Sequence, residues 1–337
     1  MNKYKAGVVG LGNIGFKYDL DKRRKGIAGI GTKTHVSAYS ENENFILSGV
    51  VEINKETREL FKAKYPKVPV YKSVSELMLD QRPDFISVCT STTTHCKIVE
   101  EIINYPVKGI LCEKPIADSP EDARKIIELC HEKKIILTVN HGRRWHGLFL
   151  KAQKIIENNE IGQIRSIIAI YSGEVFNIGT HLFDAIRMLV QKDAVCLSGC
   201  FVSEKDAVDP NLSGWIIFED NIHCSVQTNG SRYDMIFEID LIGSQGRLKI
   251  LNNGSSIELF KFEESNIYHG FKEQKIANTP AVKNTDVLKL AVLENVGIYE
   301  GARDNSVCSG YDGYQALEIS SSLLESAKRK GEPRTLK

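Results

Sequence analysis

A glycine-rich turn close to the N-terminus has the spacing that binds nucleotide phosphates. Residues 10–15, GLGNIG, follow an apolar run, Tyr4 to Val9, that we expect to be a strand, and they should open the first helix. The first glycine permits a tight turn, the second lets a pyrophosphate approach the backbone, and the third lets helix and strand pack closely. Exposed N–H groups and the helix dipole then bind the phosphates. We therefore predict cofactor contacts, rather than a purely structural turn, at Gly10, Gly12, Asn13, Ile14 and Gly15.

A carboxylate at the end of the second apolar run is the candidate that selects the cofactor. FILSGVV is followed by Glu52, which could accept both ribose hydroxyls of adenosine and would repel a 2′-phosphate. This favours NAD over NADP, and a solvated acid at a strand end is the alternative. Such an acid usually lies about 20 residues beyond the glycine motif, but here it comes considerably later.

The additional residues before Glu52 form a polar, basic stretch from Tyr18 to Lys33 that contains Arg23, Arg24 and Lys25. We expect this stretch to be a loop inserted beside the first glycine turn. Three adjacent cations could fold over an anionic substrate, because arginine holds phosphate with paired hydrogen bonds. A solvated loop with no binding role is the alternative interpretation.

Two further polar clusters follow apolar runs of strand length. Thr90 to His95 follows DFISVC, and Glu113-Lys114-Pro115 follows GILC. Doubly wound sheets bind ligands at the carboxyl ends of their strands. Pro115 restricts the backbone of Lys114 to extended geometry, so the lysine side chain can project into the cleft. We expect the cofactor to be contacted here by Thr90, Ser91, His95, Glu113 and Lys114.

The elements that must position these residues alternate along the first 141 residues. AGVVGLG, FILSGVVE, DFISVCTS, GILCEKP and IILTVN are compact apolar segments, separated by stretches of helical periodicity. The clearest helix start is Ser119-Pro120-Glu121-Asp122, with a serine N-cap, proline in the first turn and acids at the positive end of the dipole. Alternating strands and helices predict a doubly wound parallel sheet, an α/β domain over residues 1–141.

The pattern of residues along the sequence changes after about residue 150. A helix from Lys151 to Asn158 leads into strand-like runs, among them IRSIIAIYSG, SGWIIFED, NIHCSVQTNG, YDMIFEIDLIG and RLKILNNG. Asp220-Asn221 and Asn252 to Gly254 have the composition of hairpin turns. Two helical stretches, near Asp286 to Ile298 and Gln315 to Arg329, close the chain. We predict a second, α+β domain over residues 142–337, with a mainly antiparallel sheet and helices against one face.

Composition limits the partners of the 337-residue chain. Lys plus Arg is 44 and Asp plus Glu is 43, so the net charge of +1 provides no general field for nucleic acid or an anionic membrane. No apolar run approaches the roughly 20 residues that span a bilayer, and no leader pattern opens the sequence. The eight cysteines are scattered without a Cys-x-x-Cys pair. We expect a cytoplasmic protein with reduced thiols and no metal site.

The motifs taken together resemble a known family. Gly10-x-Gly12-x-x-Gly15, Thr90 to His95 and Glu113-Lys114-Pro115 are similar to the corresponding motifs of the Gfo/Idh/MocA oxidoreductases, the glucose–fructose oxidoreductase and inositol dehydrogenase group. The likeness extends over nearly the whole chain. Arg143-Arg144-Trp145, followed by Ile161-Gly162, resembles the family's linker into its second domain. Gly243 to Gly246 resembles its sheet turn, and Ser326 to Leu336 resembles its usual ending.

The family's second catalytic motif, Asp-x-Gly-x-His-x-x-Asp, resembles Asn177 to Asp184 in this chain. The resemblance implies that His181 is the general acid/base, that Lys114 is its electrostatic partner and that Asn177 positions the hydroxyl group. Asn177 replaces the family's Asp, and an amide cannot carry charge or take a proton. Arg144, Trp145 and Asp184 are candidates for shaping the substrate site, although Trp145 could equally be core packing.

The resemblance also implies an activity. It predicts an NAD-dependent dehydrogenase or reductase that transfers a hydride between the nicotinamide and a CH–OH group of a sugar, cyclitol or nucleotide-activated sugar. The alternative within the same family is a non-catalytic NAD(P)-binding regulator that senses a sugar. The family also leads us to expect a homodimer or homotetramer that associates through the second domain's sheet.

Overall fold

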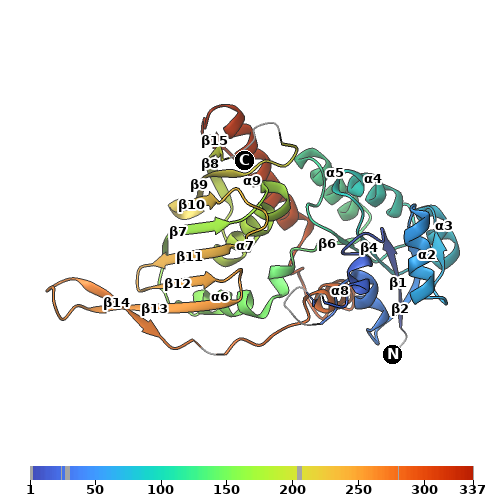
Figure 1. The fold of residues 1–337 in the computed structure, drawn as a ribbon, viewed down its shortest axis with the longest axis horizontal. Coiled ribbons are helices and arrows are strands. Elements are labelled where there is room, and N and C mark those ends of the chain that lie inside the picture. Colours follow the sequence, from blue (N-terminus) through green and yellow to red (C-terminus); the bar gives the residue numbers. More distant parts are fainter. Residues whose placement is uncertain (1–2, 24, 27–30, 203–206, 280, 337) are drawn as a thin grey trace. The chain divides into compact units, whose positions relative to one another are not determined.

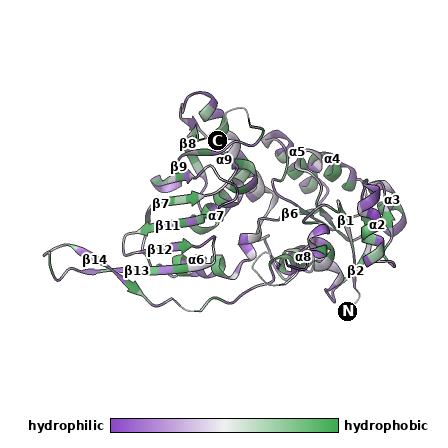
Figure 2. Cartoon of the chain, in the orientation of Figure 1, coloured by the Kyte–Doolittle hydropathy of each residue, from purple (hydrophilic) through white to green (hydrophobic). Residues whose placement is uncertain are grey.

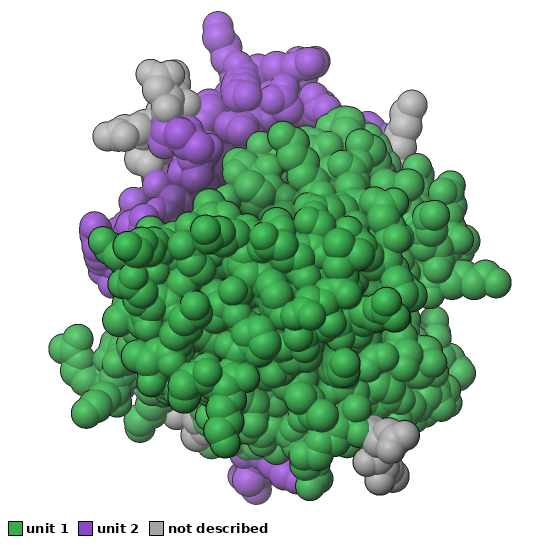
Figure 3. Space-filling view, turned by 90° about the vertical axis from the view of Figure 1, so that its right-hand side faces the viewer, with its two compact units in different colours: residues 1–146, 284–314 green, residues 147–283, 315–337 purple. Residues whose placement is uncertain are grey.

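The computed structural model describes residues 3–23, 25–26, 31–202, 207–279 and 281–336. It contains two compact units, residues 1–146 with 284–314 and residues 147–283 with 315–337, which are coloured separately in Figure 3. We expected a single boundary between residues 141 and 142. The chain instead passes between the units three times, because segment 284–314 returns to the first unit.

The first unit is built on a six-stranded parallel sheet with strand order β3-β2-β1-β4-β5-β6, which confirms the predicted doubly wound fold. Strands β1, β2, β4 and β6 of this sheet are labelled in Figure 1. Its strands are β1 (Tyr4–Val9), β2 (Phe45–Val51), β3 (Val70–Tyr71), β4 (Phe85–Val88), β5 (Gly109–Cys112) and β6 (Ile136–Val139). Its α-helices are α1 (His35–Ser40), α2 (Lys55–Lys64), α3 (Val74–Gln81), α4 (Thr92–Ile102), α5 (Pro120–Glu132) and α8 (Val287–Tyr299). Short 3-10 turns lie at Lys17–Leu20 and Gly142–Trp145.

Helix α5 begins as its sequence predicts. The Ser119 side chain accepts a hydrogen bond from the backbone N–H of Asp122, and Pro120 occupies the first turn. The buried positions Ala123, Ile126 and Cys130 recur at helical spacing. All four residues of the central strands β4 and β5 are buried, as expected for a parallel sheet covered on both faces.

The glycine motif was expected to open the first helix, but a short 3-10 turn, Lys17–Leu20, follows it, and α1 begins only at His35. Phe16 and Lys17 donate backbone hydrogen bonds to the carbonyl of Gly12 at 2.9 and 3.0 Å, and then the chain leaves the helical path. When it returns, His35 N–H donates to the Ile14 carbonyl and Val36 N–H to the Gly15 carbonyl, both at 3.1 Å. The predicted insertion therefore interrupts the first helix, whose hydrogen bonding resumes in α1. Residues 24 and 27–30 of the insertion lie outside the described residues.

Helix α8 explains why segment 284–314 belongs to the first unit. Leu288, Ala291 and Val292 are buried on this helix. The Asp286 carboxylate accepts from Lys289 N–H at the helix start, and from the backbone N–H and hydroxyl of Thr32 at 3.0 and 2.7 Å. Asp286 therefore caps α8 and also fixes the end of the insertion.

The second unit contains a nine-stranded sheet with order β14-β13-β12-β11-β7-β10-β9-β8-β15. It is antiparallel except for the β7–β10 pair, which confirms the predicted fold class. The strands are β7 (Ile164–Tyr171), β8 (Ala194–Phe201), β9 (Leu212–Phe218), β10 (Ile222–Thr228), β11 (Phe237–Gly243), β12 (Gly246–Leu251), β13 (Ser256–Glu264), β14 (Lys272–Ala277) and β15 (Arg334–Thr335).

One face of this sheet packs against α6 (Gly147–Glu157), α7 (Thr180–Val190) and the later part of α9 (Gly310–Lys328) in a single apolar core. Hydrophobic residues line β7, β11 and β12 (Figure 2). Both predicted hairpin turns are present, with positive φ at Asp220, Asn221 and residues 252–254. No helix in the described part of the chain has the length and apolar character needed to span a membrane.

Candidate cofactor and catalytic sites

The three motif glycines have three different environments. Gly10 has φ +92°, and a Cβ there would lie 2.8 Å from the Thr90 side chain. A Cβ on Gly15 would overlap the carbonyl oxygen of Gly10. A Cβ on Gly12 would have only the Cys89 carbonyl oxygen nearby, at 4.0 Å. Gly10 and Gly15 therefore close the turn, while Gly12 leaves open space of the kind a pyrophosphate requires.

Glu52 lies directly against this turn at the end of β2. Its Oε2 accepts a hydrogen bond from Leu11 N–H at 2.8 Å, and its Oε1 accepts from Asn54 N–H, also at 2.8 Å. The carboxylate is half-buried and is held by two backbone donors. The structure thus brings the predicted ribose-binding acid and the predicted phosphate-binding turn together within one unit.

The turns that follow β4 and β5 lie next to the glycine turn, because β1, β4 and β5 are adjacent parallel strands. His95 joins the two turns. Its Nδ1 lies 2.9 Å from the Pro115 carbonyl oxygen and its Nε2 lies 3.2 Å from the Thr90 carbonyl oxygen. Burial lowers the pKa of His95, although the backbone carbonyls oppose that shift. Ser91 is exposed and precedes α4.

Glu113 is buried and belongs to a polar network that the sequence analysis missed. Its Oε1 accepts from His35 Nε2 at 2.8 Å and from Asn140 Nδ2 at 2.6 Å. Burial raises the pKa of Glu113, but the hydrogen bonds from His35 and Asn140 and the positive charge of Lys114 outweigh burial, so the net pKa lies below the ordinary value. The available signals were His35 at the end of the insertion and Asn140 at the end of an apolar run.

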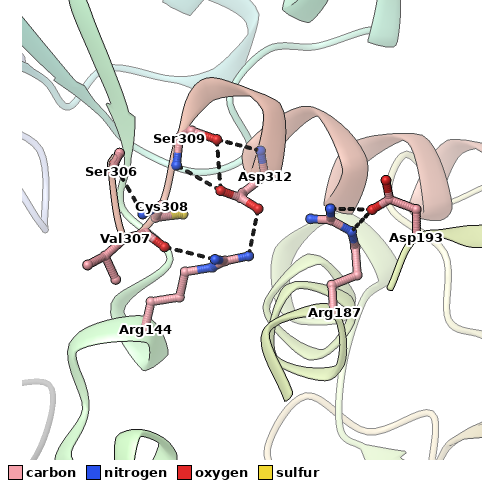
Figure 4. Close-up of polar contacts among 8 residues, drawn as sticks. All are labelled: Arg144, Arg187, Asp193, Ser306, Val307, Cys308, Ser309 and Asp312. Carbon is pink, nitrogen blue, oxygen red and sulfur yellow. Dashed lines mark hydrogen bonds and ion pairs between the residues drawn. The ribbon is translucent and has the colours of Figure 1, made fainter. Parts of the chain in front are cut away.

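Arg144 and Trp145 are largely buried in the first unit. The Arg144 guanidinium donates to the Val307 carbonyl at 2.8 Å and to Asp312 at 2.9 Å, and Asp312 in turn accepts from Ser309 (Figure 4). Trp145 Nε1 donates to Glu294 at 3.3 Å. These contacts stabilise the chain before α9, while the predicted role of both residues in substrate binding stays a prediction.

The histidine motif lies in the second unit, where a five-residue π-helical turn, Val175–Gly179, leads into α7. The backbone N–H groups of Phe176 and Asn177 donate to the Asp209 carboxylate at 2.8 and 2.9 Å. The Asn177 side chain donates to Glu174 Oε2 at 3.4 Å. Turns of this kind are frequent at functional sites. The sequence analysis missed both Glu174 and Asp209.

Helix α7 presents His181 and Asp184 one turn apart. His181 is half-buried and Asp184 is fully buried. The far end of the helix is fixed by Arg187, whose Nε donates to Asp193 at 3.0 Å (Figure 4). The second unit therefore brings Asn177, His181 and Asp184 together, whereas Lys114 belongs to the first unit.

The described residues contain no group of three or more His, Cys, Asp or Glu side chains that could hold a metal ion. All eight cysteines are free thiols. Burial raises the pKa of Cys89 and Cys112 well above the ordinary value, so these two thiols are protonated in the native unit.

Comparison with known proteins shows similarity in sequence over part of the chain and similarity in fold over nearly all of it. Residues 23–141 match the family model GFO_IDH_MocA, described as "Oxidoreductase family, NAD-binding Rossmann fold". An uncharacterized oxidoreductase of Schizosaccharomyces pombe is 30% identical over 147 residues, which cover 38% of this chain and 40% of that protein. The myo-inositol 2-dehydrogenase of Thermotoga maritima is 27% identical over 157 residues, 47% of this chain and 42% of the enzyme.

These matches span less than half the length of each relative. A solved structure from Desulfitobacterium hafniense, provisionally described as an NADPH-dependent oxidoreductase, has a TM-score of 0.81 at 17% identity. The structural match includes 99% of this chain and 98% of the solved chain. At that identity the likeness is one of fold.

Two substitutions can separate the role of the glycine turn in cofactor binding, at Gly12, from its role in folding, at Gly15. Gly12→Ala should leave the melting temperature nearly unchanged, because its Cβ meets open space, but it should weaken NAD binding by about tenfold or more through contact with the pyrophosphate. Gly15→Ala should lower the melting temperature by several degrees as well, because its Cβ overlaps the Gly10 carbonyl. Thermal unfolding and NAD titration of both variants test this, and a destabilised Gly12→Ala would contradict it.

The lowered pKa of His95 predicts a pH dependence of stability. The unfolded chain then binds a proton more readily than the folded one, so the free energy of unfolding should fall as pH drops below about 6.5, by up to about 1.4 kcal/mol per pH unit. Urea unfolding of the wild type and of His95→Gln between pH 5 and 8 measures the difference. An equal slope in the two proteins would show that His95 is not responsible.

Proposed function

We propose that this chain, whose residues 23–141 match the GFO_IDH_MocA oxidoreductase model, is a cytoplasmic NAD(P)-dependent oxidoreductase. Its substrate is a CH–OH group, or the corresponding ketone, of a sugar, cyclitol or nucleotide-activated sugar. The observation that carries the proposal is the edge formed by β1, β4 and β5, where the open space at Gly12 and the motif lysine, Lys114, follow strands of one sheet. The similarity to an enzyme that is an inositol dehydrogenase supports the substrate class.

A nicotinamide cofactor held at the glycine turn would supply the hydride chemistry in either direction. The chain's own part is to move the hydroxyl proton, and His181 does this because the unperturbed pKa of histidine is near 6.5. The ammonium of Lys114 stabilises the developing alkoxide, or polarises the ketone in the reverse direction. Asn177 orients the hydroxyl group. Arg144, Trp145 and Asp184, all buried, are the candidates for shaping the substrate site, with core packing the alternative for Trp145.

The Asn177 substitution changes how the proton leaves the site. An amide cannot relay a proton as a carboxylate does, so His181 releases its proton without the help of a carboxylate at position 177. The Asn177 amide is held by Glu174 instead. This contact fixes the direction in which the Asn177 carbonyl can accept a hydrogen bond from a substrate hydroxyl.

Glu52 gives the chain a preference for NAD over NADP. Two backbone donors keep its carboxylate beside the glycine turn, where it can accept hydrogen bonds from the ribose hydroxyls and repel a 2′-phosphate.

The second unit associates with a second copy through the sheet face opposite its helices, giving a homodimer or homotetramer. Trp215, Ser225 and Ile168 stand in register on adjacent strands of that face. The side chains of Trp215 and Ile168 are 37% and 42% exposed, so the face combines apolar and polar groups as protein interfaces do.

Lys114→Ala should lower kcat by about 10²-fold or more, because it removes a charge that acts mainly on the transition state. His181→Ala should lower kcat similarly and remove the inflection of the pH–rate profile that belongs to the base. The measurement is turnover with NAD and NADP against free sugars, inositols and nucleotide sugars.

Lys125→Ala is the matched control for loss of a lysine, because Lys125 pairs with Glu100 on the surface of the first unit. Near-normal turnover of Lys114→Ala would contradict the mechanism. Binding of NAD without turnover of any substrate in the panel would favour the sugar-sensing regulator instead of an enzyme.

Glu52→Ala should weaken NAD binding and narrow its advantage over NADP, because the acceptor for the ribose hydroxyls and the charge that repels the 2′-phosphate are lost together. Titration of both cofactors into the wild type and the variant measures the change. Equal binding of NAD and NADP by the wild type would contradict the role of Glu52.

A further inference from the structure

His35 is a fully buried histidine with a partner on each ring nitrogen. Its Nδ1 lies 2.9 Å from the hydroxyl oxygen of Ser87 on β4, and its Nε2 lies 2.8 Å from Oε1 of Glu113. The Tyr39 hydroxyl lies 3.0 Å from that of Ser87. The outermost group, Tyr39, stays a donor, because burial raises its pKa.

With the His35 ring neutral and Glu113 ionised, one direction of donation satisfies all of these contacts. Tyr39 donates to Ser87, Ser87 donates to His35 Nδ1, and Nε2–H of His35 is left to donate to Glu113. An ionised carboxylate only accepts hydrogen bonds, so this tautomer satisfies every member of the row. Asn140 gives Glu113 a second donor at 2.6 Å. The buried negative charge is therefore supported from two sides, as such a charge must be.

Glu113 immediately precedes Lys114, and its Oε2 accepts from the Lys114 backbone N–H at 3.3 Å. We infer that His35 is a positioning residue for Lys114, acting through Glu113, which it keeps ionised beside the lysine. This inference rests on the proposed function, in which Lys114 acts as a cation. His35 touches neither cofactor nor substrate in this role.

The electrostatic surroundings of Glu113 set the direction of the effect. The groups that interact with its charge are His35 from α1, His95 from α4, the thiols of Cys89 and Cys112, and Lys114. His35 and Lys114 favour the ionised form of Glu113, as does the hydrogen bond from Asn140, and both thiols are protonated. Without the His35 donor, only Asn140 and Lys114 oppose the effect of burial, so protonation of Glu113 becomes more favourable than in the wild type. A protonated Glu113 would deprive Lys114 of the neighbouring negative charge that holds its proton.

The test compares His35→Leu, which removes the donor, with His35→Gln, whose amide N–H can still reach Glu113. His35→Leu should lower kcat by about tenfold or more, change KM and NAD affinity by about twofold or less, and move the alkaline limb of the kcat–pH profile to lower pH. His35→Gln should restore most of the rate and the position of the limb. A profile that does not move in His35→Leu would overturn the inference.

A double-mutant cycle tests whether His35 acts through Glu113. His35→Leu combined with Glu113→Gln should be no slower than Glu113→Gln alone, because the carboxylate through which His35 acts is already neutral. Additive losses would overturn the inference. His131→Gln is the control for loss of a histidine, because His131 is exposed on α5.

A readout independent of turnover separates this inference from the proposed function. NMR titration of the Lys114 side chain, in the full chain without cofactor, should give a lower pKa in His35→Leu than in the wild type. If the wild type has no turnover but this pKa falls, only the proposed function fails; if it has turnover and the pKa is unchanged, only the inference fails. Should His35→Leu not fold, Ser87→Ala keeps the ring, removes its orienting hydroxyl and should move the pKa in the same direction.

Discussion

The α-carbon of Gly15 lies so close to the carbonyl oxygen of Gly10 that no side chain fits between them. This contact makes the chain reverse immediately after β1, and Gly12 is left facing open space beside the end of the strand. Because β4 and β5 run parallel to β1, the turns that follow them meet the same edge. Glu52 and Thr90 lie against this turn, next to Leu11 and Gly10 respectively, and Glu113 follows the neighbouring strand β5.

The sheet edge beside the glycine turn accommodates the insertion between that turn and α1. A helix split after its first turn would lose the hydrogen bonds that continue it, yet His35 and Val36 donate to the same carbonyls that an uninterrupted helix would use. The entropic cost of closing a loop grows only slowly with its length. Contacts at the two ends, such as Thr34 with Asp19 and Thr32 with Asp286, then offset that cost.

Short sequence patterns predicted correctly those structural elements that are determined by residues close together in the chain. The cap of α5, the hairpin turns and the long buried strands follow from neighbouring residues, so they could be identified in the sequence. The two-residue strands β3 and β15 have too little periodicity to detect, and β8, β13 and β14 were also not anticipated. The glycine motif predicted the turn correctly, but the helix expected to begin there starts only at His35, because the insertion separates residues that remain hydrogen-bonded.

For the candidate site, too, residues marked by a local pattern could be predicted, whereas contacts between residues distant in the sequence could not. Lys114 and Glu52 could be found because each ends an apolar run. The contacts of Glu113 with His35, and of Asn177 with Asp209, join residues 78 and 32 positions apart, and no local pattern specifies such pairs. The single domain boundary failed for a related reason, since α8 belongs by its buried face to a sheet whose last strand ends at Val139.

The late position of α8 in the sequence also affects how the first unit folds while the chain is being synthesised. The six strands of the first sheet leave the ribosome early, but the helix that covers part of that sheet follows the whole of residues 147–283. Until then the apolar surface that α8 buries is exposed to water, and the first unit is incomplete. Folding of a newly made chain therefore cannot proceed strictly domain by domain. Most of the second unit is already available when the first acquires its last helix.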